Sequence, residues 1–168
     1  YGYAIAVAKY GYHPIVGFLA AGLAPALFAI VVGLPSLRLR GLYLAITTLA
    51  FSYIIANLIL EARSFTGGAR GITVMRPEML GLDFSSDQAF ALLCMAVAAI
   101  TLFACLNISR SRIGRAFMAI RDNDIAARTM GVNLQSFKLY AFMTSALITG
   151  LAGALMGIYL SFVSVEGF

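Results

Sequence analysis

Charged side chains are scarce in this sequence. Only 11% of its 168 residues are Asp, Glu, Lys or Arg, whereas 61% are hydrophobic. Soluble domains usually carry about 25% charged residues. The scarcity therefore excludes an ordinary soluble domain and favours a protein whose partner is a lipid bilayer. The net charge of +5 does not indicate a nucleic-acid partner, because the basic residues are not gathered on one soluble surface with aromatic residues between them.

Residues that usually perform catalysis or hold metals are also rare. His13 is the sole histidine and stands beside Pro14, whereas a metal site needs several convergent ligands. The sequence contains no HExxH, no GxSxG and no phosphate-binding glycine loop. Cys94 and Cys105 fall in one expected helix, roughly 16 Å apart, which is too far for a disulfide. We therefore expect no catalytic residue, no cofactor and no metal.

Four uncharged runs are long enough to cross a bilayer, and we place the spans at residues 15–37, 41–60, 88–109 and 139–163. An α-helix needs about 20 residues to span ~30 Å of hydrocarbon. The runs predict an all-α fold, a polytopic transmembrane helical bundle with one domain over residues 1–168. None of them carries a charged residue in its interior, which argues against a proton-coupled carrier. Since the sequence opens on YGYAIAVA and stops soon after the last run, we expect an internal fragment of a larger protein.

Loop charge predicts the orientation, because cytoplasmic loops of membrane proteins carry an excess of Lys and Arg. The loop over residues 107–138 should face the cytoplasm, as should the short link with Arg38 and Arg40. The loop over residues 61–87 has no positive bias and should face outward. The cytoplasmic loop holds Arg110, Arg112, Arg115, Arg121, Arg128 and Lys138 against Asp122 and Asp124. The outward loop holds Arg63, Arg70 and Arg76 against Glu61, Glu78, Asp83 and Asp87.

The cytoplasmic loop has the features of a short helix. Residues 115–130 contain neither Gly nor Pro, and Asp124 with Arg128 forms an acid-first i,i+4 pair. Gly131, followed by Asn133, supplies a stop signal. We expect this helix to expose Ala126, Ala127 and Met130, a surface that suits either a protein groove or anionic lipid headgroups. Ala127→Leu would overpack a groove fitted to alanine but leave a lipid-bound helix intact.

The outward loop contains TGGARGI, with Thr66, Gly67, Gly68 and Gly71. Glycines permit positive φ angles and close backbone approach. We expect a tight turn, which either lies near the mouth of a pathway or serves only as a connection.

Four blocks in order resemble a known family, the LivM-type permease subunits of branched-chain amino acid ABC importers. They are LRLRGLYLAITTLAF, TGGARGI, GRAFMAIRDNDIAARTMGVN and LAGALMGIYLSFVS, and the resemblance covers nearly the whole sequence. It implies a multi-pass protein of the bacterial inner membrane that works with a second permease subunit, two ABC ATPase subunits and a periplasmic substrate-binding protein. Relatives that move urea or short amides share the pattern, so it leaves the substrate open between these solutes and branched-chain amino acids.

The resemblance also implies an ATPase-docking helix in the cytoplasmic loop. Importers generally carry Glu-Ala-Ala-xxx-Gly there. Here the alanines and the glycine are intact, the acid is an Asp one residue earlier, and the downstream Ile-x-Leu-Pro is missing. The expected docking residues are Arg121, Asp124, Ala126, Ala127, Arg128 and Gly131. The function expected is that of an importer permease without catalysis of its own. The alternatives are a membrane enzyme whose active site lies outside this sequence and a passive channel.

Overall fold

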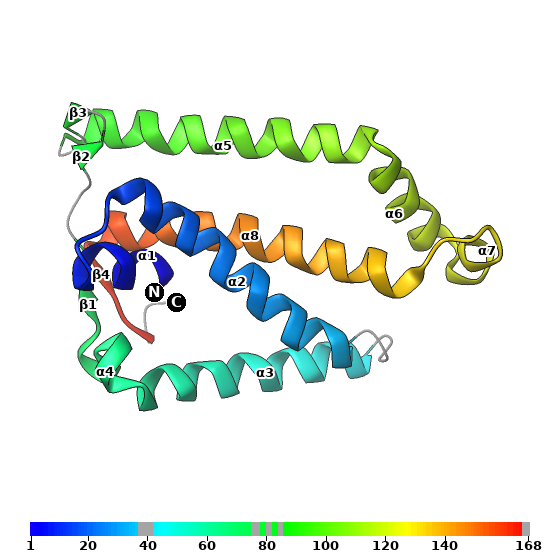
Figure 1. Ribbon diagram of the computed structural model, residues 1–168, viewed down its shortest axis with the longest axis horizontal. Coiled ribbons are helices and arrows are strands. Elements are labelled where there is room, and N and C mark those ends of the chain that lie inside the picture. The colour runs from blue at the N-terminus through cyan, green and yellow to red at the C-terminus, as the bar shows by residue number, and fades with distance from the viewer. Residues whose placement is uncertain (37–41, 75–77, 80–81, 84–85, 166–168) are drawn as a thin grey trace.

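Long helices make up most of the molecule (Figure 1). The computed structural model describes residues 1–36, 42–74, 78–79, 82–83 and 86–165. The expected link with Arg38 and Arg40, together with Arg76 of the outward loop, lies outside the described residues. The expectation of an all-α transmembrane bundle is confirmed.

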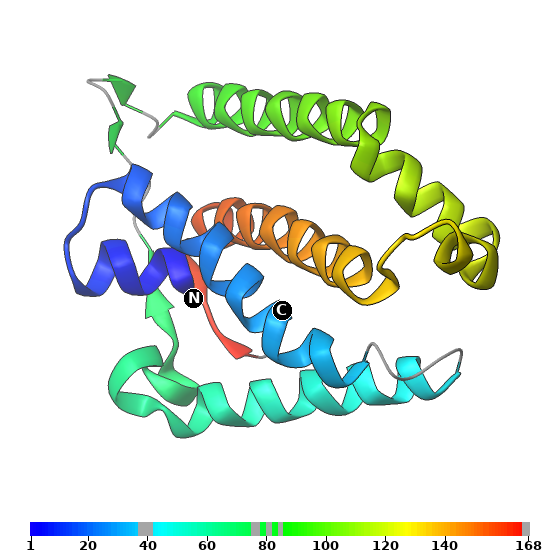
Figure 2. The ribbon, with the colours of Figure 1, turned by 45° about the vertical axis from the view of Figure 1, so that its right-hand side comes forward.

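Four long helices run between two ends of the molecule (Figures 1 and 2). They are α2 (Pro14–Ser36), α3 (Leu42–Glu61), α5 (Asp87–Arg110) and α8 (Leu134–Leu160). Within the described residues, the segments Pro14–Gly33, Asp87–Arg110 and Leu134–Leu160 are long and apolar enough to cross a membrane, and α3 adds the shorter apolar segment Ala45–Glu61. Helix α8 starts five residues before the expected span, because Lys138 lies in its second turn and forms an ion pair there instead of ending the helix.

Short elements connect the long helices. At the amino end, α1 (Gly2–Ala4) continues into a π-helix, η1 (Ile5–Lys9). One end of the molecule holds α4 (Arg63–Thr66), the 3₁₀-helix η2 (Gly68–Arg70) and four two-residue strands. The other end holds α6 (Arg112–Asp122) and α7 (Asp124–Thr129) (Figure 1). The strands are β1 (Ile72–Thr73), β2 (Glu78–Met79), β3 (Leu82–Asp83) and β4 (Phe162–Val163), and they pair antiparallel as β1 with β4 and β2 with β3.

The closest helix packing joins α2 to α8. Gly150 of α8 lies so close to α2 that a Cβ atom built on it would come within 2.0 Å of the carbonyl oxygen of Ala21. Small residues allow backbones to approach where lipid removes the hydrophobic drive for helix association. The buried core extends from this crossing toward the strand end of the molecule, and its members are Tyr3, Ala4, Ala21, Val74, Phe90, Ala154, Ile158 and Val163.

Polar caps determine where the helices at the α7 end begin. The Ser111 hydroxyl accepts hydrogen bonds from the backbone N–H groups of Ile113 and Gly114 at 3.1 and 3.3 Å, which starts α6 directly after α5. Gly114 makes this corner possible, because a Cβ atom there would lie 2.3 Å from the Ser109 carbonyl oxygen. Helix α6 therefore turns away from α5 and carries α7 to the extreme end of the molecule (Figure 1).

Candidate functional site

The expected docking segment folds as two helices, which corrects the prediction of one helix over residues 115–130. Helix α6 ends at Asp122 and α7 begins at Asp124. Asn123 separates them in an extended conformation (φ −159°, ψ 108°), and its side-chain oxygen accepts hydrogen bonds from the N–H groups of Ile125 and Ala126 at 2.9 and 3.1 Å. An Asn side chain competes with helix continuation when it caps the next turn. The break between α6 and α7 therefore follows from Asn123.

Ala127 is buried, which corrects the expectation that it is exposed. Only 2% of its surface is accessible, since α7 packs against both α6 and α8. The outer face of α7 presents Ile125 and Ala126, and Met130 follows as the C-cap. Ile125 and Met130 are 73% and 83% exposed. Ala127→Leu would therefore disturb packing inside this chain and cannot distinguish a protein groove from lipid headgroups. The large apolar side chains exposed on α7 and at its C-cap are Ile125 and Met130.

Asp124 joins α7 to α8. Its Oδ2 lies 2.9 Å from the Lys138 ammonium, and the two side chains are only 25% and 32% exposed. The i,i+4 spacing in the sequence predicted Arg128 as the partner of Asp124. Local spacing could not indicate Lys138, because it lies 14 positions away. The neighbouring pair, Arg121 with Asp122, spans 3.1 Å but is 79% and 68% exposed. Water screens such exposed pairs, and this one lies within α6, whereas the half-buried pair of Asp124 with Lys138 connects α7 to α8.

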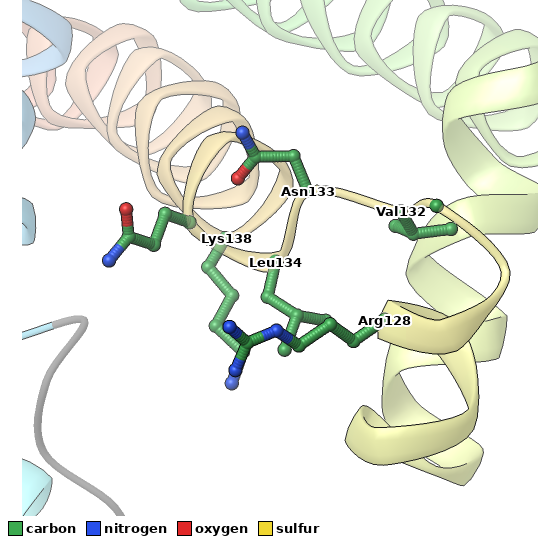
Figure 3. Close-up of a pocket in the computed structure, with 7 residues that line it drawn as sticks. Arg128, Val132, Asn133, Leu134 and Lys138 are labelled. Atoms are coloured by element: carbon green, nitrogen blue, oxygen red, sulfur yellow. The ribbon is translucent and has the colours of Figure 1, made fainter.

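A basic hollow of about 500 Å³ lies between α7 and the start of α8. Figure 3 shows Arg128 extending from α7 toward the first turns of α8, where Leu134 and Lys138 lie. Gly131 has φ +84°, as expected of a helix stop, and its N–H donates to the Arg128 carbonyl at 3.1 Å. Asn133 then caps α8, because its side-chain oxygen accepts a hydrogen bond from the Ser136 N–H at 3.3 Å. The turn places α7 beside the hollow.

The TGGARGI loop lies at the opposite end and is tightly built. Gly67, Gly68 and Gly71 have φ angles of +73°, +59° and +65°, which side chains with a Cβ atom rarely adopt. Thr66 is buried, and its hydroxyl lies 2.6 Å from the Ile59 carbonyl and accepts a hydrogen bond from the Gly68 N–H at 3.2 Å. A substitution such as Gly68→Val would therefore disrupt the turn itself, because its Cβ atom would lie 2.9 Å from Arg63 Cγ.

The structure also joins this loop to the end of α8. Strand β1 follows the glycines and pairs with β4, with Ile72 opposite Val163 and Thr73 opposite Phe162. Ser161 ends α8 in the left-handed conformation (φ 56°), and its carbonyl accepts a hydrogen bond from the Val74 N–H at 3.0 Å. Two sequence blocks that lie about 90 residues apart thus form one structural unit.

The expected site residues form two groups at opposite ends of the molecule. Asp124, Ala126, Ala127, Arg128 and Gly131 lie on α7 and its exit turn, with Arg121 one residue from the end of α6. Thr66 and the three glycines lie in the other group.

Sequence reasoning missed three residues that hold these ends together, which are Asn123, Lys138 and Ser161. An Asn before a helix-forming stretch is a local signal that could have indicated Asn123. The roles of Lys138 and Ser161 depend on contacts between distant segments. The described residues contain no group of three or more His, Cys, Asp and Glu side chains that could hold a metal ion.

Comparison with known proteins identifies the family. Residues 1–168 match the family described as "Branched-chain amino acid transport system / permease component". Two relatives carry the name "High-affinity branched-chain amino acid transport system permease protein LivM", one from Escherichia coli (strain K12) and one from Salmonella typhimurium (strain LT2). Each is 36% identical over 172 aligned positions, which cover 88% of this chain and 40% of the relative. No solved structure matches the chain.

The match extends over the whole sequence, so it includes both the α7 end and the glycine loop. The chain spans less than half the length of these relatives. Together with the long apolar helices, the family places it in the inner membrane as a multi-pass protein. The resemblance found in the four sequence blocks is confirmed: the chain belongs to the family of branched-chain amino acid transport permease components.

Proposed function

We propose that this chain is part of the membrane-spanning permease subunit of an ABC importer, which moves branched-chain amino acids or a related small solute and is powered by separate ATPase subunits. The family membership and the printed names of its two relatives support the transport role. The proposed partners are two ABC ATPase subunits, a second permease subunit and a periplasmic substrate-binding protein. In this proposal the ATPase subunits supply the catalysis and the nucleotide site, and the chain supplies part of the membrane pathway.

The observation that carries the proposal is the outer face of α7. Ile125 and Met130 are large apolar side chains that stand exposed at the tip of the molecule, where the bundle offers them no cover. Arg128 and the basic hollow lie beside them. An apolar helix face with charged neighbours suits a groove in another protein. We assign this groove to the ATPase subunits, and the Lys and Arg excess at this end orients it toward the cytoplasm.

Helix α6 suits the alternative that the sequence left open, a helix that lies on anionic lipid headgroups. Its apolar residues Ala116, Phe117 and Ile120 are half-buried, and the Phe117 ring meets the Phe137 ring of α8 edge-on with 6.2 Å between centroids. Arg112 and Arg115 are exposed. Such a helix suits the boundary between protein and anionic headgroups. The break at Asn123 therefore separates a surface helix from a docking helix.

Helix α8 connects the docking end to the outward loop. Near its start, Lys138 pairs with Asp124 of α7, and at its end Ser161 and β4 bond to the segment that follows the three glycines. A rigid helix of 27 residues carries a displacement along its length. Movement of α7 on a closing ATPase dimer would therefore reach the outward loop through α8, as alternating access requires.

The test substitutes the exposed apolar residues of α7. In the full permease, Ile125→Glu and Met130→Glu should each weaken ATPase co-purification by about 10-fold or more, since burying such a side chain contributes roughly 1.5 to 3 kcal/mol. Insertion into the membrane should be unchanged. The matched control is Met118→Glu on α6, which is also exposed but lies outside the docking helix.

Three outcomes would contradict the proposal. Full ATPase association in both α7 variants would remove α7 as the docking element. Solute uptake by the purified permease without ATPase subunits would favour the passive channel. A reaction product in place of uptake would favour the membrane enzyme.

A further inference from the structure

A groove of about 450 Å³ runs between α5 on one side and α2 and α8 on the other. Figures 1 and 2 both show α5 lying apart from these two helices along much of its length. The helix is attached at its two ends. Phe90 belongs to the buried core and stacks on Tyr159 of α8 with 6.5 Å between ring centroids, and at the other end α6 packs against α8. The groove lies between these two attachments.

The wall of the groove is apolar. It includes Leu93, Val97, Ile100, Ala104 and Ile108 from one face of α5 and Leu147 from α8. Among the described lining residues, hydroxyl groups occur only on Thr101 and Thr144, and both donate to their own helix: Thr101 to the Val97 carbonyl, and Thr144 to the Tyr140 carbonyl at 2.9 Å. An occupant of the groove is therefore offered apolar surface and no hydrogen-bond donor that lacks an acceptor.

The dimensions of the groove select a thin occupant. Leu93 and Ile108 mark its two ends on α5, and they are separated by ~22 Å along the helix axis at ~1.5 Å per residue. One leaflet contributes about half of the ~30 Å of hydrocarbon, so the groove is long enough for one acyl chain. A further α-helix of this length and ~10 Å diameter would need roughly 1,700 Å³, about four times the volume of the groove. The space is too narrow for a whole helix.

Three arginines follow the groove where α5 turns into α6. Ile108 lines the groove, and Arg110, Arg112 and Arg115 come directly after it and are all exposed. Arg115 points back toward the end of α5, because its Nη1 donates to the Arg110 carbonyl at 3.4 Å. Residues 107–120 contain no Asp or Glu that could neutralise them. Basic side chains next to membrane helices on the cytoplasmic side attract anionic lipid headgroups, and loop charge orients this end toward the cytoplasm.

We propose that the groove and the three arginines form a binding site for one anionic phospholipid of the cytoplasmic leaflet. An acyl chain lies between α5 and α8, and the phosphate lies at Arg112 and Arg115. The lipid fills the space that separates α5 from the rest of the bundle. This inference goes beyond the proposed transport function, and none of its residues belongs to the docking surface of α7.

The test measures lipid binding to the purified full permease in one detergent. Dioleoyl phosphatidylglycerol and dioleoyl phosphatidylcholine are added separately as mixed micelles. Native mass spectrometry counts the bound lipids, and thermal unfolding over a lipid titration reports the affinity. Phosphatidylglycerol should bind more tightly than phosphatidylcholine and should raise the melting temperature at lower concentration.

The headgroup contact is tested with the double variant Arg112→Gln/Arg115→Gln. It should weaken phosphatidylglycerol binding roughly 20- to 30-fold, because each basic side chain near an anionic headgroup contributes about a factor of five. Binding of phosphatidylcholine should stay the same. The matched control is Arg121→Gln, since Arg121 is exposed further along α6 and its charge is compensated by Asp122. This variant should keep the preference for phosphatidylglycerol.

The acyl-chain contact is tested by filling the groove. Ala104 lines the groove and is exposed, so Ala104→Phe should fold normally and should weaken the binding of both lipids. The matched control is Ala99→Phe, because Ala99 is also exposed on α5 but does not line the groove. It should leave the binding of both lipids unchanged. The melting temperature of each variant without added lipid reports its folding.

A photoreactive phosphatidylglycerol with a diazirine in one acyl chain locates the lipid. Cross-links should map to residues 97–108 or 144–151, which include the two walls of the groove. Cross-links that avoid both segments would refute the site and would show that another helix of the full permease or a partner subunit covers the groove. An unchanged lipid preference in Arg112→Gln/Arg115→Gln, or unchanged lipid binding in Ala104→Phe, would also overturn the proposal. Each of these results would leave the transport function standing, because none of the measurements uses solute uptake.

Discussion

The crossing of α2 and α8 makes a strong prediction about two glycines on the same helix. A Cβ atom at Gly150 would lie 2.0 Å from the Ala21 carbonyl oxygen and 2.8 Å from Pro25 Cγ. This is about 1.5 Å short of an optimal contact distance of ~3.5 Å. A Cβ atom at Gly153, one turn away, would meet nothing within 4 Å. Alanine should therefore be tolerated at Gly153 and not at Gly150.

The magnitude follows from two opposing effects. Gly→Ala in a helix gains about 1 kcal/mol from helix propensity, and both substitutions gain it equally. At Gly150 the added methyl group forces α2 and α8 apart, and overpacking of this kind costs about 1 to 3 kcal/mol. A radial gap of 0.5 to 1 Å also forfeits a quarter to a half of the contact energy along the interface. We expect Gly150→Ala to be less stable than Gly153→Ala by roughly 1 to 3 kcal/mol.

The assay is thermal or denaturant unfolding of the purified full permease in one detergent, with both variants measured beside the natural protein. Gly153→Ala serves as the matched control for helix propensity and for the chemistry of the substitution. Equal stability of the two variants would refute the reasoning, because it would show that α2 and α8 do not cross at Gly150 in the assembled protein.

Two further predictions test the connections at the ends of the bundle. Asp124→Asn leaves Lys138 without its half-buried partner, so it should weaken the response of the ATPase to solute while membrane insertion stays normal. The control is Asp122→Asn, at an exposed pair, which should leave both the ATPase response and the insertion unchanged. Thr66→Val keeps the side-chain shape but removes the hydroxyl that holds the turn, and should lower the stability of the permease by about 1 to 3 kcal/mol, measured as the unfolding free energy. Thr66→Ser should restore most of it, and failure of this rescue would mean that the hydroxyl is not the cause.

Local patterns in the sequence carried much of the correct interpretation. The uncharged runs predicted the long helices, because hydrocarbon thickness sets the length of an apolar helix. The glycines at 67, 68, 71 and 131 predicted tight turns, and all four have positive φ angles in the structure. The four sequence blocks identified the family, which the comparison over the whole chain confirmed. Each of these features is readable within a few residues or from order along the chain.

The tertiary structure decided which residues meet. Ile125, Ala126, Ala127 and Met130 are all apolar, so a helix as short as α7 offers no periodicity that selects its buried face. Packing against α6 and α8 buries Ala127 and leaves Ile125 and Met130 outside.

The same limit applies to contacts between distant segments. The pairing of Asp124 with Lys138 and the strand pair that joins the glycine loop to α8 each depend on residues separated by many positions. Helix and strand periods describe only the direction of each side chain from its own backbone. The sequence therefore determined the helices, their order and the loops at each end of the molecule. The packing of α2, α7 and α8 decided which side chains are buried and which stay exposed, because contacts between helices depend on their relative positions.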